Sequence, residues 1–122
     1  MPESVIDPAT YGELQATAGA DFVAELVDTF LEEAPGMLAE LRSARADADP
    51  DRFRRAAHSL KSNCHTFGAL ALGALARELE LKGMTADDAS RINALEAEYA
   101  RAAAALKELR HGWTRRAAAS GR

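Results

Sequence analysis

The chain has 122 residues, a formal net charge of −4 at pH 7 and a composition that is 48% hydrophobic. This length suits one domain with a single packed core, and the acidic balance disfavours a dedicated nucleic-acid binder, whose surface is usually basic. A single cysteine, the lack of any apolar run near the ~20 residues that cross a bilayer and the lack of a signal peptide predict a cytoplasmic protein that contacts no membrane.

Alanine, leucine, glutamate and arginine dominate the chain, which indicates an all-α protein. The first predicted helix is short and covers about residues 11–18. Asp7 is placed to cap its N-terminus, Pro8 suits its first position, and Gly19 is a natural residue for its C-terminus. We expect this helix to cover one end of a helical bundle.

A long helix follows, for which Asp21 is the expected N-cap. Its apolar face recurs at helical spacing and comprises Phe22, Val23, Leu26, Val27, Phe30, Leu31, Ala34, Leu38 and Leu41. Pro35 lies inside this pattern, where it removes a backbone donor and crowds the preceding turn. Because the apolar spacing resumes afterwards, we expect a kink near residues 32–35 rather than the end of the helix.

The third and fourth helices are predicted to form an antiparallel hairpin. Residues 45–50 read as a loop, with Asp49 as the cap and Pro50 at the first position of the third helix. That helix ends just before Gly68, which permits a tight break. The fourth helix ends at Gly83, and helices joined so closely pack against each other.

The last helix is predicted to be long, with Thr85 and Asp88 at the spacing of a capping pair. Its apolar positions alternate by three and four, as in a helix packed at a shallow angle in a bundle. They are Ile92, Leu95, Tyr99, Ala102, Leu106 and Leu109. We therefore predict an antiparallel up-down four-helix bundle with a short extra N-terminal helix over residues 1–112, followed by a tail at residues 113–122.

His58 lies off the apolar stripe of the third helix. Its neighbours three and four positions away are Arg54, Arg55, Lys61 and Ser62, so the imidazole lies on a basic strip that faces solvent. An exposed imidazole is a good nucleophile near neutral pH because much of it is uncharged and has a free nitrogen lone pair. His58 can therefore accept a phosphoryl group, and Lys61 is placed to donate to its oxygens. Arg54 and Arg55 would act as field or docking charges.

Residues 57–80 resemble the signature of histidine-containing phosphotransfer (HPt) domains, approximately A-H-x-L-K-G followed by a glycine, a leucine and L-E. The matching positions are Ala57, His58, Leu60, Lys61, Gly68, Leu72, Leu75, Leu79 and Glu80. The segment FLEEAP also resembles the second helix of that family, so the likeness covers about residues 5–110. Where the family usually has a glycine after the lysine, this chain has Ser62, whose hydroxyl would crowd or hydrogen-bond a phosphoryl group.

The resemblance implies roles for three residues. His58 would be phosphorylated on Nε2, and Lys61 would stabilise the phosphoryl oxygens. Glu80, on the adjacent helix, would accept a hydrogen bond from Nδ1 of the imidazole and so keep Nε2 free. The implied function is that of a phosphorelay intermediate in two-component signalling, which accepts the group from a receiver-domain aspartate and passes it to another receiver.

The implied partners are the receiver domains of response regulators and a hybrid histidine kinase, and the protein itself would be a monomer. It would need no cofactor of its own, because the receiver would supply both the aspartate and Mg²⁺. No kinase domain is expected in this chain, which leaves its classification as an enzyme open.

Two other functions compete with this one. A histidine kinase dimerisation fragment carries its histidine on a two-helix hairpin in each subunit, but its pattern resembles H-[DE]-x-x-x-P, whereas Ser59 follows His58 and no proline lies nearby. A helical adaptor without phosphoryl chemistry would leave Lys61 and the two arginines as solvated charges. In that case Glu80 would be an ordinary partner of nearby cations.

His65 and Cys64 follow His58 on the same helix. His65 lies seven positions after His58 and hence on nearly the same face, where it would border the docking surface or compete as a nucleophile; the first is favoured. Cys64 falls on the apolar stripe and is interpreted as a core residue. The spacing of these side chains does not match paired metal ligands, so no metal site is expected.

Overall fold

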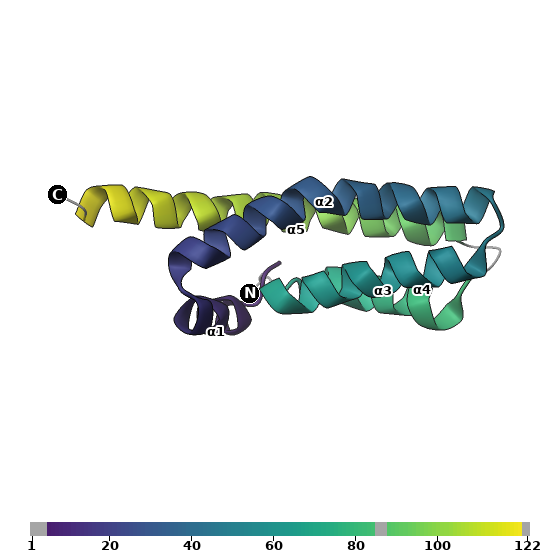
Figure 1. The fold of residues 1–122 in the computed structure, drawn as a ribbon, viewed down its shortest axis with the longest axis horizontal. Helices are drawn as coiled ribbons and strands as arrows, with labels where there is room; N and C mark the ends of the chain where they lie inside the picture. Colours follow the sequence, from purple (N-terminus) through teal and green to yellow (C-terminus); the bar gives the residue numbers. More distant parts are fainter. Residues whose placement is uncertain (1–4, 85–87, 121–122) are drawn as a thin grey trace.

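The computed structural model describes residues 5–84 and 88–120, apart from the side chains of residue 88 and residues 111–120. Five α-helices make up this part of the chain. They are α1 (Pro8–Ala18), α2 (Ala20–Ala46), α3 (Pro50–Phe67), α4 (Leu70–Lys82) and α5 (Asp88–Ser120), drawn in Figure 1. The prediction of an all-α fold is confirmed.

Helices α2 to α5 lie side by side as a bundle in which consecutive helices run in opposite directions (Figure 1). Both α2 and α4 pack against α3 on one side and α5 on the other. The short helix α1 contacts α2 and α3 and lies across one end of the bundle. This arrangement confirms the predicted up-down bundle with an extra N-terminal helix.

The core is built from apolar side chains of all four bundle helices. The largest fully buried ones are Val23, Val27 and Leu41 of α2, Phe53, Leu60 and Cys64 of α3, Leu72 and Leu79 of α4, and Ile92, Leu95 and Leu106 of α5. Burying each of the larger side chains contributes roughly 1.5–3 kcal/mol. Because α3 packs on both α2 and α4, its rotation about its own axis is fixed, and residues on its outer face have defined positions.

Two helices begin with the predicted aspartate cap, and in each a proline occupies the first turn. The Asp7 carboxylate accepts hydrogen bonds from the backbone N–H and the hydroxyl of Thr10, at 3.0 and 2.6 Å. The Asp49 carboxylate accepts one from the backbone N–H of Arg52 at 3.2 Å. The two bonds from backbone N–H groups satisfy donors that the helix itself leaves without a partner.

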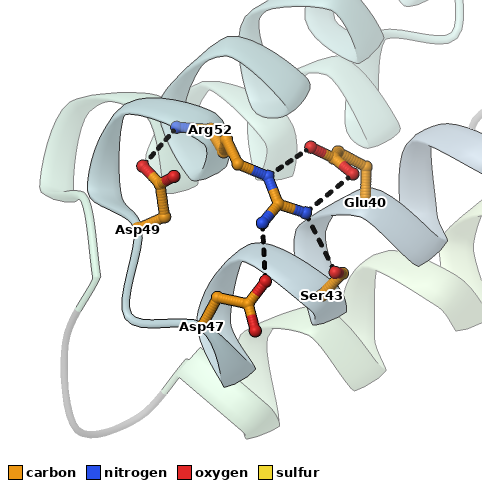
Figure 2. A network of polar contacts seen from close by, with 5 residues as sticks. All are labelled: Glu40, Ser43, Asp47, Asp49 and Arg52. Atoms are coloured by element: carbon orange, nitrogen blue, oxygen red, sulfur yellow. Dashed lines mark hydrogen bonds and ion pairs between the residues drawn. The ribbon is translucent and has the colours of Figure 1, made fainter.

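Figure 2 shows how Arg52 holds the turn between α2 and α3. Its Nε and Nη2 donate to the Glu40 carboxylate at 2.8 and 3.1 Å, Nη1 donates to Asp47 at 2.7 Å, and Nη2 also donates to Ser43 Oγ at 2.9 Å. The bonds to Glu40 and Asp47 raise the pKa of the Arg52 guanidinium. The bond between Arg52 and Glu40 also lowers the pKa of Glu40. The start of α3 is thereby tied to the end of α2.

Gly68 ends α3 in the left-handed conformation, at φ 83°, in agreement with the predicted tight break. A side chain is excluded there, since a Cβ atom on Gly68 would lie 2.9 Å from Thr10 Cβ and 3.1 Å from the Asp7 carbonyl oxygen. The Gly68 carbonyl also accepts a hydrogen bond from the backbone N–H of Asp7 at 2.8 Å. The turn between α3 and α4 is therefore joined to the start of α1.

The predicted N-cap of α2 is wrong. α2 begins at Ala20, and Gly19 both ends α1 and caps α2, without a side-chain hydrogen bond. Gly19 adopts φ 94°, a conformation that glycine tolerates, so the chain has already turned before Asp21. Asp21 lies instead in the first turn of α2, where its charge interacts favourably with the helix dipole.

Two apolar residues that were predicted to face the core are exposed. Phe22 is 51% exposed, because the adjacent Val23 is the residue of this first turn that is fully buried, and neighbouring helix positions point about 100° apart. Leu109 is 38% exposed and lies one turn beyond Leu106, the last buried residue among the described side chains of α5. Phe22 therefore points away from the buried side of α2, whereas the apolar pattern of α5 continues past its last buried position.

The other boundaries of α2 and α5 agree in part with the prediction. α2 runs without interruption through Pro35, as predicted, and its ribbon changes direction part-way along its length (Figure 1). Arg45 and Ala46, which were predicted to begin the loop, are still helical. Thr85, the predicted cap of α5, lies outside the described residues.

The C-terminal part of α5 extends past the other helices in Figure 1. The helix continues without a break through residue 112 to Ser120, and the division into a bundle and a tail at that point stays a prediction. In the described part of the chain, no helix combines the length and the apolar character that crossing a membrane requires.

Candidate functional site

His58 lies on the outer face of α3, and its side chain is 58% exposed. Ala57 and Leu60, close to it in sequence, are fully buried. The imidazole therefore stands on a helix that cannot rotate without exposing core residues to water. As predicted, the ring faces solvent from a rigid element.

The ring is oriented by Glu80 of α4. Nδ1 of His58 lies 2.7 Å from Oε2 of Glu80, and Nζ of Lys61 lies 2.7 Å from Oε1 of the same carboxylate. The contact with Lys61, and to a smaller extent that with His58, lowers the pKa of Glu80, so the carboxylate is ionised at neutral pH. An ionised carboxylate can only accept hydrogen bonds, and Nδ1 must therefore be the donor. A neutral imidazole in this state has its lone pair on Nε2.

Glu80 depends on Lys61 for charge compensation. The Glu80 side chain is 18% exposed, and its Oε1 is shielded from water and makes no other polar contact with the described residues. A shielded carboxylate oxygen without a cation would be costly. Lys61 is itself only 21% exposed, so the pair forms a partly buried unit against the imidazole.

The register between α3 and α4 brings His58 and Glu80 together. A Cβ atom on Gly73 would lie 3.2 Å from His65 Cδ2 and 3.3 Å from Cys64 Cβ, so the two helices approach closely at this glycine. His65 lies seven residues after His58, and Gly73 lies seven residues before Glu80. From this contact, two turns toward the N-terminus of α3 lead to His58, and two turns toward the C-terminus of α4 lead to Glu80. Because the helices run antiparallel, both paths go in the same direction, and the two side chains meet.

A shallow hollow of about 370 Å³ lies beside the imidazole. It is lined by Arg54, Arg55, His58, Ser59 and Glu80. Arg54 forms an ion pair with Asp51 at 3.2 Å, and both side chains are exposed. The two arginines that were predicted as docking charges therefore border a space next to the candidate phosphoacceptor, together with the Glu80 carboxylate.

The comparison with known proteins establishes the family. The family model described as "Hpt domain" matches residues 25–105, which is more than half of the chain. The chain belongs to the Hpt domain family. The Hpt domain is similar to the sensor protein TorS of Escherichia coli (strain K12), with 31% identity over 81 residues. That match covers 66% of this chain and 9% of TorS, so the chain spans a small part of that relative.

A solved structure supports the same assignment. The crystal structure of histidine-containing phosphotransfer protein B (HptB) from Pseudomonas aeruginosa PAO1 matches this Hpt domain with a TM-score of 0.83 at 26% sequence identity. The match covers 90% of this chain and 97% of HptB. The predicted family and bundle are thus confirmed. Hpt domains relay phosphoryl groups in two-component phosphorelays, with receiver domains and hybrid kinases.

Two other residues predicted for the Hpt site do not line the hollow. Ser62 is exposed one turn along α3 from His58, and its backbone carbonyl accepts a hydrogen bond from the Thr66 hydroxyl at 3.1 Å. The His65 ring packs on Gly73 instead of contacting the phosphoacceptor. A role for either residue at the border of a docking surface stays a prediction.

Sequence reasoning missed two residues on which the Hpt site depends. Gly73 was not singled out, although a glycine inside a helix is a recognised signal of close helix approach. Arg52 was also passed over, although several carboxylates lie within a few residues of it in the loop before α3. Neither residue touches the imidazole, but both set the position of the helix that carries it.

The remaining candidate side chains have structural roles. Cys64 is fully buried, and burial raises the pKa of its thiol to about 12, so it is an unreactive core residue as predicted. Among the described side chains, at residues 5–84 and 89–110, no group of three or more histidines, cysteines, aspartates or glutamates is arranged to hold a metal ion.

Proposed function

We propose that this Hpt domain is a phosphorelay intermediate in which His58 accepts a phosphoryl group from the aspartate of one receiver domain and passes it to the aspartate of another. The observation that supports this most directly is the fixed imidazole, whose Nδ1 donates to the ionised Glu80 at 2.7 Å. In the neutral ring the opposite nitrogen, Nε2, then has the bare lone pair and is the nucleophile.

On the side of the Hpt domain, the transfer step uses groups that are already in place. The Nε2 lone pair attacks the phosphorus of the receiver's acyl phosphate, the N–P bond forms, the P–O bond to the aspartate breaks, and the aspartate leaves as a carboxylate. The ring gains positive charge during the attack, and Glu80 stabilises that charge through the hydrogen bond from Nδ1. Attack by the second receiver's aspartate reverses the step and restores the neutral imidazole. Such a transfer depends mainly on alignment and charge neutralisation, and the receiver supplies Mg²⁺.

Lys61 acts in two ways in this proposal. It keeps Glu80 ionised through the contact at 2.7 Å, and its positive charge, one turn along α3 from His58, offsets part of the charge of the phosphoryl group. The first effect orients the ring, and the second stabilises the phosphorylated state. The Lys61–Glu80 geometry supports the first effect directly.

We infer that the domain acts as a monomer. Helices α2 to α5 of one chain enclose a single core, whereas the dimerisation fragment of a histidine kinase combines a hairpin from each of two subunits. A closed bundle within one chain supports the phosphorelay role over the kinase fragment. Light scattering distinguishes them, because the kinase fragment would have twice the mass of the chain.

Transfer from a receiver domain carrying radioactive phosphate on its aspartate tests the proposal. The wild-type protein should acquire the label and lose it to a second receiver, and His58→Gln should stay unlabelled. His65→Gln is the matched control for labelling, since it makes the same change on the same helix and should still acquire the label. Equal labelling of the wild type and His58→Gln, or no labelling from a panel of receivers, would contradict the proposal.

A further inference from the structure

The basic residues around the imidazole differ in whether a carboxylate holds them. Lys61 contacts Glu80 at 2.7 Å, and Arg54 contacts Asp51 at 3.2 Å. Arg55 is exposed, and no carboxylate among the residues whose side chains are described lies within ion-pair distance of its guanidinium. After the stronger contact of Arg52, the charge of Arg55 also lowers the pKa of Glu40 on α2. Because Glu40 lies beyond ion-pair distance, it does not hold the Arg55 guanidinium, which can turn toward an incoming anion.

Arg55 lies on the side of α3 that faces away from α4. It lines the hollow that contains His58 and also a second hollow, of about 440 Å³, whose lining includes Glu40 of α2. Arg55 therefore stands at the edge of α3 nearest to α2. Lys61 lies at the opposite edge, where it reaches α4 through Glu80.

The two nitrogens of the His58 ring point in different directions relative to α4. Nδ1 is directed at Glu80 on α4, so Nε2, across the ring, is directed away from α4. Residues three apart on a helix have Cβ atoms about 5–6 Å apart, and helical side chains lean toward the N-terminus of their helix. Arg55 precedes His58 by three residues, and a phosphoryl group on Nε2 would enter the hollow that Arg55 lines.

We propose that Arg55 binds the phosphoryl group of phosphorylated His58 and neutralises its charge, as a contact separate from that of Lys61. Its guanidinium is permanently charged and offers a fork of N–H donors that matches phosphoryl oxygens. Glu80 and Lys61 then hold the ring from the Nδ1 side, and Arg55 holds the product on the Nε2 side. The proposal rests on the proposed function for the source of the phosphoryl group, but the contact itself requires only that His58 be phosphorylated.

Chemical phosphorylation with phosphoramidate tests the contact without a receiver domain. Nε2 attacks the phosphorus, the P–N bond of phosphoramidate breaks, and ammonia leaves. The ³¹P resonance of phosphorylated His58 is assigned by its loss in His58→Gln, and its chemical shift is then followed with pH. The charged groups around the two hollows are Arg52, Arg54, Arg55 and Lys61 of α3, Glu33 and Glu40 of α2, and Glu80 of α4.

A cation beside the phosphoryl group favours the dianion and so lowers the pH at which the last phosphoryl proton is half titrated. Arg55→Gln should raise this pH by about 0.7 unit, the shift that one charge 4 Å away produces in fully aqueous surroundings. Arg54→Gln is the matched control. It removes the same charge from the same hollow, but the Arg54 guanidinium contacts Asp51, whose negative charge offsets part of it, so the shift should be smaller than in Arg55→Gln. Arg55→Lys should retain most of the wild-type behaviour.

Three results would overturn the proposal: an unchanged titration in Arg55→Gln, equal shifts in the two arginine variants, or failure of phosphoramidate to phosphorylate His58. Circular dichroism checks that the variants fold, which is expected because Arg55 is exposed. A protein whose phosphoryl group titrates as expected but exchanges with no receiver would refute the phosphorelay role and leave the Arg55 contact standing.

Discussion

Replacing Glu80 by glutamine isolates the charge of the group that orients the imidazole. Glutamine has nearly the same shape, and its carbonyl oxygen can still accept the hydrogen bond that Nδ1 of His58 makes to Oε2 at 2.7 Å. A hydrogen bond to a charged group contributes about 1.5–3 kcal/mol, against about 0.5–1.5 kcal/mol for a neutral one. The Glu80 side chain is 18% exposed, so solvent screens this difference only in part.

The charge matters most when the ring becomes positive during attack on the phosphorus. A loss of about 1–1.4 kcal/mol at that point corresponds to transfer that is five- to tenfold slower. Single-turnover transfer from a phosphorylated receiver gives the rate, and ¹⁵N NMR of the imidazole reports which nitrogen carries the proton. In the wild type the proton should be on Nδ1, and Glu80→Gln should populate both tautomers.

Glu78→Gln is the matched control for this experiment. Glu78 lies on the same helix, but its partner is Arg91 of α5, at 2.8 Å, and not the imidazole. The control should transfer at the wild-type rate with an unchanged tautomer. If Glu80→Gln behaves like this control in both measurements, the reasoning that Glu80 prepares Nε2 is refuted.

Three further predictions concern the same helices. Lys61→Ala should slow transfer about five- to tenfold with an unchanged circular dichroism spectrum, because one positive charge near the phosphoryl group is lost; a normal rate would remove Lys61 from the mechanism. Lys61 lowers the pKa of Glu80 in the folded protein below its value in the unfolded chain. The ionised Glu80 therefore stabilises the folded protein fully above its unfolded-state pKa, and this stabilisation is lost as the pH falls through its folded-state pKa. Urea unfolding of the wild type and Glu80→Gln should therefore differ near neutral pH and converge in acid, and a constant difference would contradict this. Gly68→Ala should lower the free energy of unfolding by at least about 1–2 kcal/mol, because of its left-handed backbone and crowded surroundings, whereas Gly12→Ala, which has open space around its Cβ position, should not destabilise the protein.

Helical periodicity was sufficient to predict the outward position of His58. On α3 the buried residues recur at spacings of three and four, and His58 lies near the middle of the opposite face, so it was expected to face solvent. The caps at Asp7 and Asp49 were predictable for a similar reason, since each bond spans three residues of one chain segment. Features set by local geometry can be derived from the sequence.

Features that depend on how two helices meet were not predictable from spacing. The family resemblance implied that Glu80 contacts His58, but residues 22 apart meet only because Gly73 and the turn at Gly68 set the register of α4 on α3. The Arg52 network likewise required the end of α2 to lie beside the start of α3. The wrong N-cap of α2 has the same origin, because one glycine serves two adjacent helices and no local pattern indicates this sharing.

Because the imidazole and α3 are held in place, alignment with the incoming aspartate depends on the receiver domain. The Nδ1 side is held by Glu80 on α4, so turning the ring breaks that hydrogen bond. The flanking residues Ala57 and Leu60 are fully buried, so α3 cannot shift toward an incoming aspartate without exposing core residues. Alignment must therefore come from how the receiver docks, since in-line attack tolerates little displacement. Exposed charges beside the ring, such as Arg55, then affect both docking and the phosphorylated product, and a salt titration separates the two effects. Docking is screened strongly by salt, whereas a contact with a covalently attached phosphoryl group is screened much less.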